Sequence, residues 1–156
     1  MSDNSYSRFR HVNPHELKRV TKRAFAQYCS NNGWSFDRVG LHEARVNSNK
    51  LSEFERHTPS FIVDRDFDDP ETDLIWVEVK ACNASGQIRI PVSEWESHSQ
   101  LDRMREVHYA LLKPQTKNLG DLVDNLDYAI KTVALKDLRD KMTADENSYT
   151  FGYDDV

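Results

Sequence analysis

The chain has little of what marks a fibrous, disulfide-bonded or membrane protein. Its 156 residues include five Gly, five Pro and two Cys, which excludes a collagen-like or low-complexity composition and a disulfide framework. No apolar run approaches the roughly 18 residues that a membrane-spanning helix needs, and residues 1–5 (MSDNS) lack the apolar core of a secretory signal. We therefore expect an intracellular, cytoplasmic protein that has no membrane partner.

The composition that remains is typical of a globular domain, with 38% hydrophobic and 30% charged residues. A single domain of about 150 residues buries roughly 68–70% of the surface that its unfolded chain exposes, so it needs no metal or disulfide to fold. We predict one domain, divided into an N-terminal arm (1–13), a core (14–142) and an acidic tail (143–156).

Positive charge is scarce overall but concentrated at one end. The chain carries 21 Lys and Arg against 26 Asp and Glu, a balance that by itself argues against binding a polyanion. Residues 1–25, however, hold six of the basic side chains and only two acidic ones. Such a segment can contact nucleic acid, although an ordinary solvated surface is the alternative interpretation. The candidate nucleic-acid-binding residues are Arg8, Arg10, Lys18, Arg19, Lys22 and Arg23.

A helix is predicted over residues 14–31. Asn13 is a good N-cap and Pro14 suits the first helical position, while Gly33 allows the left-handed conformation that often ends a helix. Apolar residues recur at helical spacing between these ends, at Leu17, Val20, Ala24, Phe25 and Tyr28. The basic residues of this segment lie off that stripe, so we expect them to form one exposed basic face.

The rest of the chain predicts an alternation of strands and helices. Apolar patterning predicts strands over residues 34–39, 88–92, 107–112 and 128–134. Helices are predicted over 93–105, where Ser93 and Glu96 form a capping-box pattern, and over 137–142. We expect loops at 40–57, with a helical turn at 51–56, and around Pro114 and Gly120, and an edge strand or loose tail at 150–153. This order predicts an α/β fold in which helices flank a mixed sheet.

Two alternating runs, residues 61–67 and 75–80, flank the turn segment DPETD and predict a β-hairpin. On the second strand Glu78 and Lys80 are two residues apart and therefore share a face. A carboxylate and an ammonium on one strand face are common on exposed strands, so this pair alone identifies no site.

The register of the hairpin decides whether a second carboxylate joins the pair. A turn centred on Glu71 places Asp64 opposite Glu78, with Cβ atoms about 4.5–5.5 Å apart. Two carboxylates that close repel each other unless a cation neutralises them, and Mg²⁺ prefers such oxygen ligands. A turn centred on Asp69 would instead place Ser60 opposite Glu78 and remove one carboxylate. We favour the first register, because an Asp-Pro dipeptide is expected inside the loop.

The hairpin carries the motif Asp64-x13-Glu78-Val79-Lys80, preceded by Thr58-Pro59. This motif, in the order helix, strand, hairpin, strand, helix and strand, resembles the PD-(D/E)XK nuclease superfamily. The resemblance spans roughly residues 14–140 and implies the restriction-endonuclease-like fold, a three-layer sandwich around a mixed sheet. Two features depart from the family's pattern. Ser60 stands at the Pro-Asp position, and the first helix is basic where many members have a glutamate.

The resemblance implies a metal-dependent nuclease that hydrolyses DNA phosphodiester bonds as an endonuclease. Asp64 and Glu78 would bind Mg²⁺, with Mn²⁺ as an alternative, and Lys80 would stabilise the charge that builds on phosphorus. The basic residues near the N-terminus would contact the phosphate backbone. DNA is the expected partner, RNA is not excluded, and a homodimer is plausible. So compact a nuclease would suit a phage or mobile element.

Two other interpretations stay open. Ser60 and the missing helix glutamate also suit a catalytically inactive member of the same fold that binds nucleic acid or a protein partner. The third interpretation is an unrelated α/β domain in which Glu78 and Lys80 are ordinary surface residues.

Overall fold

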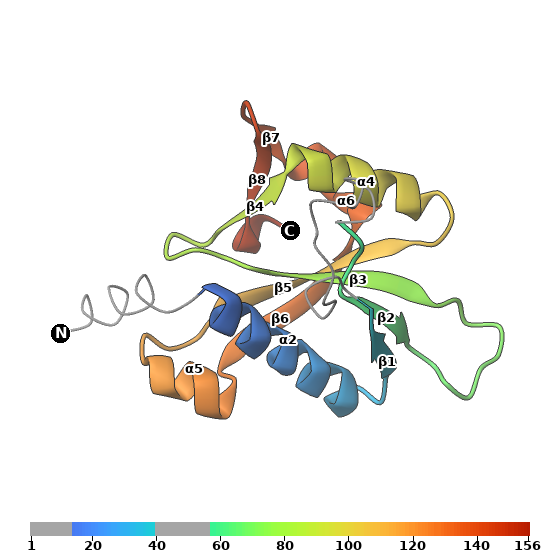
Figure 1. Cartoon of the computed structure of the whole chain (residues 1–156), viewed down its shortest axis with the longest axis horizontal. Helices are drawn as coiled ribbons and strands as arrows, with labels where there is room; N and C mark the ends of the chain where they lie inside the picture. Colours follow the sequence, from blue (N-terminus) through green and yellow to red (C-terminus); the bar gives the residue numbers. More distant parts are fainter. Residues whose placement is uncertain (1–13, 40–56) are drawn as a thin grey trace.

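A five-stranded mixed sheet forms the centre of the molecule (Figure 1). The computed structural model describes residues 14–39 and 57–156. In sheet order the strands are β1 (Ser35–Arg38), β2 (Phe61–Asp64), β3 (Ile75–Ala81), β5 (Val107–Pro114) and β6 (Tyr128–Ala134). β3 and β5 run parallel, and every other neighbouring pair in this sheet is antiparallel.

Helices cover both faces of this sheet and make it the middle of three layers. α2 (Pro14–Asn31) and α5 (Leu119–Asn125) lie on one side, and α4 (Val92–Asp102) and α6 (Leu135–Leu138) lie on the other (Figure 1). The predicted α/β sandwich with a mixed sheet is therefore confirmed. None of the described helices is long and apolar enough to cross a membrane.

Strand β5 shows why an apolar core forms on each side of the sheet. Tyr109 and Leu111 belong to the cluster under α4, whereas Ala110 and Leu112 belong to the cluster under α2. Successive side chains of a strand point to opposite faces, so a strand covered on both sides needs a continuous apolar run. Burying one large apolar side chain of this kind stabilises the fold by roughly 1.5–3 kcal/mol.

Most predicted elements lie where the sequence places them. α2 and β6 have the predicted bounds, and β1 differs by one residue at each end. The predicted loop and helical turn at 40–56 lie outside the described residues, as do Arg8 and Arg10.

The C-terminal residues form part of a second, three-stranded sheet. Its order is β4 (Gln87–Pro91), β8 (Ser148–Gly152) and β7 (Thr143–Ala144). β8 is therefore the middle strand rather than the predicted edge strand or loose tail. It is held there because it pairs with a strand on each side, and because Phe151 and the following Tyr153 are buried in the core under α4.

Helix α4 begins and ends earlier than predicted. Pro91 is its N-cap and no side chain caps it, so the predicted capping box of Ser93 and Glu96 is wrong. The helix predicted over 137–142 is likewise replaced by the short α6 and a 3-10 turn, Arg139–Lys141.

Helix α5 stands where the sequence predicts only a linker. Asn118 is its N-cap, and the side-chain oxygen accepts a hydrogen bond from the Asp121 N–H. Leu122 is buried and anchors the helix. Gly120 falls in the first turn, where its presence suggests a break but does not prevent a capped short helix.

The β2–β3 hairpin has the register that we did not favour. Phe61 pairs with Val77, and continuing this ladder places Ser60 opposite Glu78. The expectation that Asp64 faces Glu78 is therefore wrong. The pairing brings a large aromatic residue opposite a branched aliphatic one, a combination that stabilises adjacent strands.

The turn between the strands explains this register. Asp69 stands at its centre, and one carboxylate oxygen accepts the Glu71 N–H at 2.9 Å while the other accepts the Thr72 hydroxyl at 3.0 Å. An aspartate that binds its own backbone two residues onward builds the turn itself. Asp64 consequently lies at the far end of β2, where it pairs with Ser35 of β1.

Candidate active site

A cleft of about 380 Å³ opens beside the middle of β3. Four parts of the chain line it: α2, residues 57–60, strand β3 and the start of α4. Its charged and titratable side chains are Lys18, Lys22, His57, Glu78, Lys80 and Glu94. The structure thus brings the predicted Glu78 and Lys80 together in one cleft, and Asp64 is not among the lining residues.

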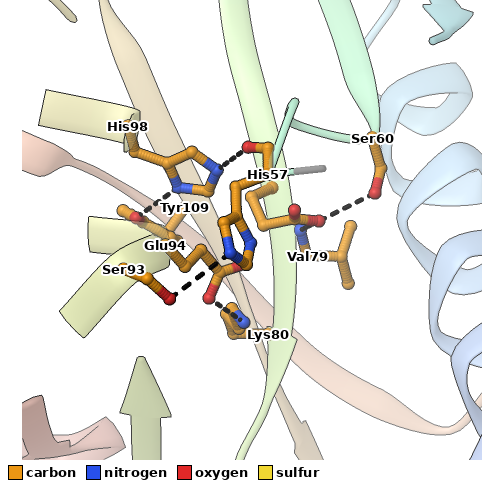
Figure 2. Close-up of polar contacts among 9 residues, drawn as sticks. His57, Ser60, Val79, Lys80, Ser93, Glu94, His98 and Tyr109 are labelled. Carbon is orange, nitrogen blue, oxygen red and sulfur yellow. Dashed lines mark hydrogen bonds and ion pairs between the residues drawn. The ribbon is translucent and has the colours of Figure 1, made fainter. Parts of the chain in front are cut away.

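Glu78 is held by two hydrogen bonds to one of its carboxylate oxygens. Oε1 accepts the Ser60 hydroxyl at 2.7 Å and the Val79 N–H at 3.1 Å (Figure 2). Burial raises the pKa of this carboxyl, the nearby Lys80 ammonium opposes the rise, and the Glu94 carboxylate adds to it. The negative charge of Glu78 is therefore costly here, although Ser60 keeps the side chain in place.

Lys80 reaches across the cleft to a carboxylate that the sequence analysis did not identify. Its Nζ lies 2.6 Å from Oε2 of Glu94, whose residue is only 7% exposed (Figure 2). Glu94, His98 and Leu101 fall at positions i, i+4 and i+7 of α4, so they share one helix face. That spacing was the available signal, because a glutamate on the inner face of a helix needs a partner.

His98 locks α4 to the segment that carries Ser60. Nε2 lies 2.6 Å from the main-chain carbonyl oxygen of His57, and Nδ1 lies 2.6 Å from the Tyr109 hydroxyl (Figure 2). A carbonyl only accepts, so Nε2 carries the proton and Nδ1 accepts the tyrosine O–H. Burial lowers the pKa of His98 to about 4, so the ring is neutral near pH 7.

The carboxylates of this cleft fit a divalent cation. Ligand atoms of Glu78, Glu94 and His98 lie within 4.8 Å of one another. Both nitrogens of His98 are occupied by hydrogen bonds, which leaves the two glutamates as the oxygen donors. Mg²⁺ commonly takes one or two carboxylates and keeps several waters, and a cation between these groups would offset the cost of the Glu78 charge.

The first helix contributes differently from the prediction. Lys18, Arg19 and Arg23 are exposed, as expected. Lys22 is only 7% exposed and lines the cleft together with Lys18 and Thr21. The expected position of Lys22 on the exposed basic face is therefore wrong, because residues 18, 21 and 22 share the helix face that turns toward β3.

The charge of the cleft suits an anionic substrate. Among the lining residues that the structure describes, three lysines stand against two glutamates. The acidic balance of the whole chain is thus reversed locally, and a positive cleft concentrates polyanions at its mouth.

Comparisons with known proteins yield matches among solved structures alone. No family model matches the sequence, and no curated protein matches it. The chain is similar to Hjc, a Holliday junction resolvase from the archaeal hyperthermophile Archaeoglobus fulgidus, with 12% identity and a TM-score of 0.53 over 86% of this chain and 83% of Hjc. It is also similar to a nuclease from a fusselovirus, with 11% identity and a TM-score of 0.43 over 89% of this chain and 80% of that one.

The likeness to Hjc concerns the fold. It covers most of both chains and agrees with the mixed sheet and its two helical layers. The molecule has the restriction-endonuclease-like fold that its motif predicts.

Proposed function

We propose that this restriction-endonuclease-like chain is a divalent-metal-dependent nuclease that cuts DNA in the cleft beside β3. One observation carries the proposal: Glu78, Lys80 and Glu94, from two different elements, converge in a single cleft whose other wall carries Lys18 and Lys22. Two carboxylates and a lysine beside a basic wall are the groups that phosphodiester hydrolysis needs.

Each of these residues has a role that its position supports. Glu78 and Glu94 would hold a divalent cation, which would neutralise the negative charge that develops on the phosphate oxygens. Ser60 fixes the orientation of the Glu78 carboxylate through its 2.7 Å hydrogen bond. The Lys80 ammonium exchanges its bond to Glu94 for a non-bridging phosphate oxygen and stabilises the charge that develops there.

The exposed part of α2 extends this site toward the DNA backbone. Lys18 lies at the cleft and Arg19 and Arg23 lie on the outer surface of the same helix. Each phosphate that such side chains neutralise makes binding weaker as salt rises. Contacts to phosphate position the substrate without reading its sequence, so an endonuclease that recognises DNA structure is the form we propose.

Plasmid cleavage tests this proposal. Supercoiled and branched DNA are incubated with Mg²⁺, Mn²⁺ or EDTA and with wild type, Lys80→Ala, Glu94→Gln or Glu96→Gln. Glu96 is exposed on the same helix and provides the matched control. We expect metal-dependent cleavage that Lys80→Ala and Glu94→Gln reduce by about 10²-fold or more, with Glu96→Gln like wild type. Loss in all variants alike would contradict the assigned site.

Ser60 favours a second function, a nuclease-fold module that binds nucleic acid or a protein without cutting. The hydroxyl stands where the family has a carboxylate, so the cleft has one anionic metal ligand fewer than the family pattern. The same assay separates the two functions, because the module would bind DNA equally well in EDTA and leave the plasmid intact at every metal concentration.

A further inference from the structure

His57 is the cleft residue to which the proposed function gives no role. It immediately precedes the Thr58-Pro59-Ser60 segment, its side chain is half-buried, and it lines the cleft with Glu78, Lys80 and Glu94. Imidazole is the side chain that both holds and releases a proton near neutral pH. Among the lining residues that the structure describes, His57 is the only histidine.

The surroundings of His57 fix its place and leave one edge of the ring available. Its main-chain carbonyl accepts the His98 Nε2 proton at 2.6 Å, and its own Nε2 lies 3.4 Å from the Ser93 hydroxyl (Figure 2). Within residues 14–39 and 57–156, Nδ1 makes no hydrogen bond and the ring forms no ion pair with either cleft glutamate. The imidazole is therefore held in place by two contacts and is not engaged in an ion pair with either glutamate.

The chemistry of the cleft lacks a proton donor for the leaving group. A phosphodiester releases a sugar alkoxide, which is a poor leaving group until it is protonated. Lys80 is held 2.6 Å from Glu94, and an ammonium is a weaker acid than an imidazolium.

We propose that His57 is the general acid of the reaction, an assignment that rests on the proposed nuclease function. Water attacks phosphorus and the bond from phosphorus to the departing sugar oxygen breaks. The protonated imidazole gives its proton to that oxygen, and a proton from the attacking water passes to solvent. The products are one phosphate monoester and one hydroxyl end, and His57 regains a proton from solvent for the next turnover.

A leaving-group substitution tests this assignment. Two DNA substrates carry either oxygen or sulfur at the bridging position of the mapped cleavage site, and both are cut in Mn²⁺ by wild type and His57→Gln. A thiol has a pKa of about 8.5 and departs without protonation. We expect His57→Gln to slow cleavage of the oxygen substrate by about 10²–10⁴-fold and to cut the sulfur substrate at nearly the wild-type rate.

A second variant and two further measurements distinguish a catalytic role of His57 from a structural one. Ser93→Ala leaves the imidazole but removes its anchor, so we expect a smaller loss that is again confined to the oxygen substrate. It also serves as the second variant should His57→Gln fail to fold, which thermal unfolding reports. DNA affinity measured in Ca²⁺ should stay at the wild-type value for both variants.

Three results would overturn the assignment. Equal losses on the two substrates would give His57 a structural or binding role, and no loss on either would give it none. In both cases the proposed nuclease function would stand, because wild type still cuts. Cleavage of neither substrate by wild type would remove the nuclease function and the general acid together.

Discussion

The two ends of the β2–β3 hairpin carry similar residues and do different things. At one end Ser60 holds Glu78 inside a cleft that Lys80 and Glu94 complete. At the other end Asp64, the last residue of β2, accepts a hydrogen bond from the Asp66 N–H at 3.1 Å, a local contact at the start of the turn. An acidic residue near a Glu-x-Lys strand is therefore no site by itself. The register that places it, and the helix packed against it, decide what it can bind.

The largest effect should come from removing a carboxylate at the cleft end, compared with removing one at the other end. Glu78→Gln removes a carboxylate from the cleft, and we expect metal-dependent cleavage to fall by about 10²-fold or more. Asp64→Asn removes one from the end of β2 next to the turn and should change the rate by less than about twofold. Initial rates of plasmid nicking measure both losses of activity. A larger loss in Asp64→Asn than in Glu78→Gln would indicate that Asp64 belongs to the site.

A carboxylate added at the cleft end should sharpen the difference. Ser60→Asp places a second acid opposite Glu78, so we expect about tenfold tighter Mg²⁺ binding, equivalent to about 1.4 kcal/mol. Without metal the two acids repel each other, and the midpoint of thermal unfolding in EDTA should fall. Calorimetric titration measures the affinity, with Phe67→Asp in the exposed turn as the control that leaves it unchanged.

The pH dependence of stability should report the buried carboxylate at the cleft end. Burial raises the pKa of Glu78 above its unfolded value of 4.5. Its contribution to metal-free stability is thus fully present below pH 4.5 and lost as pH rises through the folded-state pKa. In EDTA we expect Glu78→Gln to gain stability over wild type as the pH rises above 4.5. Urea unfolding of the two proteins across the pH range measures this, and a wild type that stays the more stable protein throughout would contradict the expectation.

The smallest effect should lie on the outer surface of α2. Arg19→Ala removes one exposed charge, so we expect a modest loss of DNA affinity and a salt dependence whose slope is shallower by about one. Fluorescence anisotropy at several salt concentrations measures the slope. An unchanged slope would place the DNA elsewhere than along α2.

Periodicity predicted the elements of this fold but could not predict the hairpin register. An alternation of two fixes only which side chains share a face. Registers that place Ser60 or Asp64 opposite Glu78 differ by four positions, so both keep Phe61 and Val77 in the core. The choice was made by the Asp69 side chain, whose hydrogen bonds centre the turn on itself.

Only the residues of the cleft that lie on one strand could be predicted, for a related reason. Glu78 and Lys80 share one strand, so local spacing brings them together. Glu94 and His57 reach the same cleft from a helix and a loop, and only tertiary packing, fastened by the His98 hydrogen bonds, makes them neighbours. The predicted exposure of Lys22 was wrong because a charged side chain is usually solvated, whereas the helix face that carries Lys22 turns toward β3.

Calorimetric titration with Mg²⁺ and Mn²⁺ shows whether Glu78 and Glu94 together bind the cation. We expect one site per chain in wild type, Asp64→Asn and Glu96→Gln, and affinity weakened by about tenfold or more in Glu94→Gln and in Glu78→Gln. Wild-type affinity in Glu94→Gln, or a loss confined to Asp64→Asn, would contradict it.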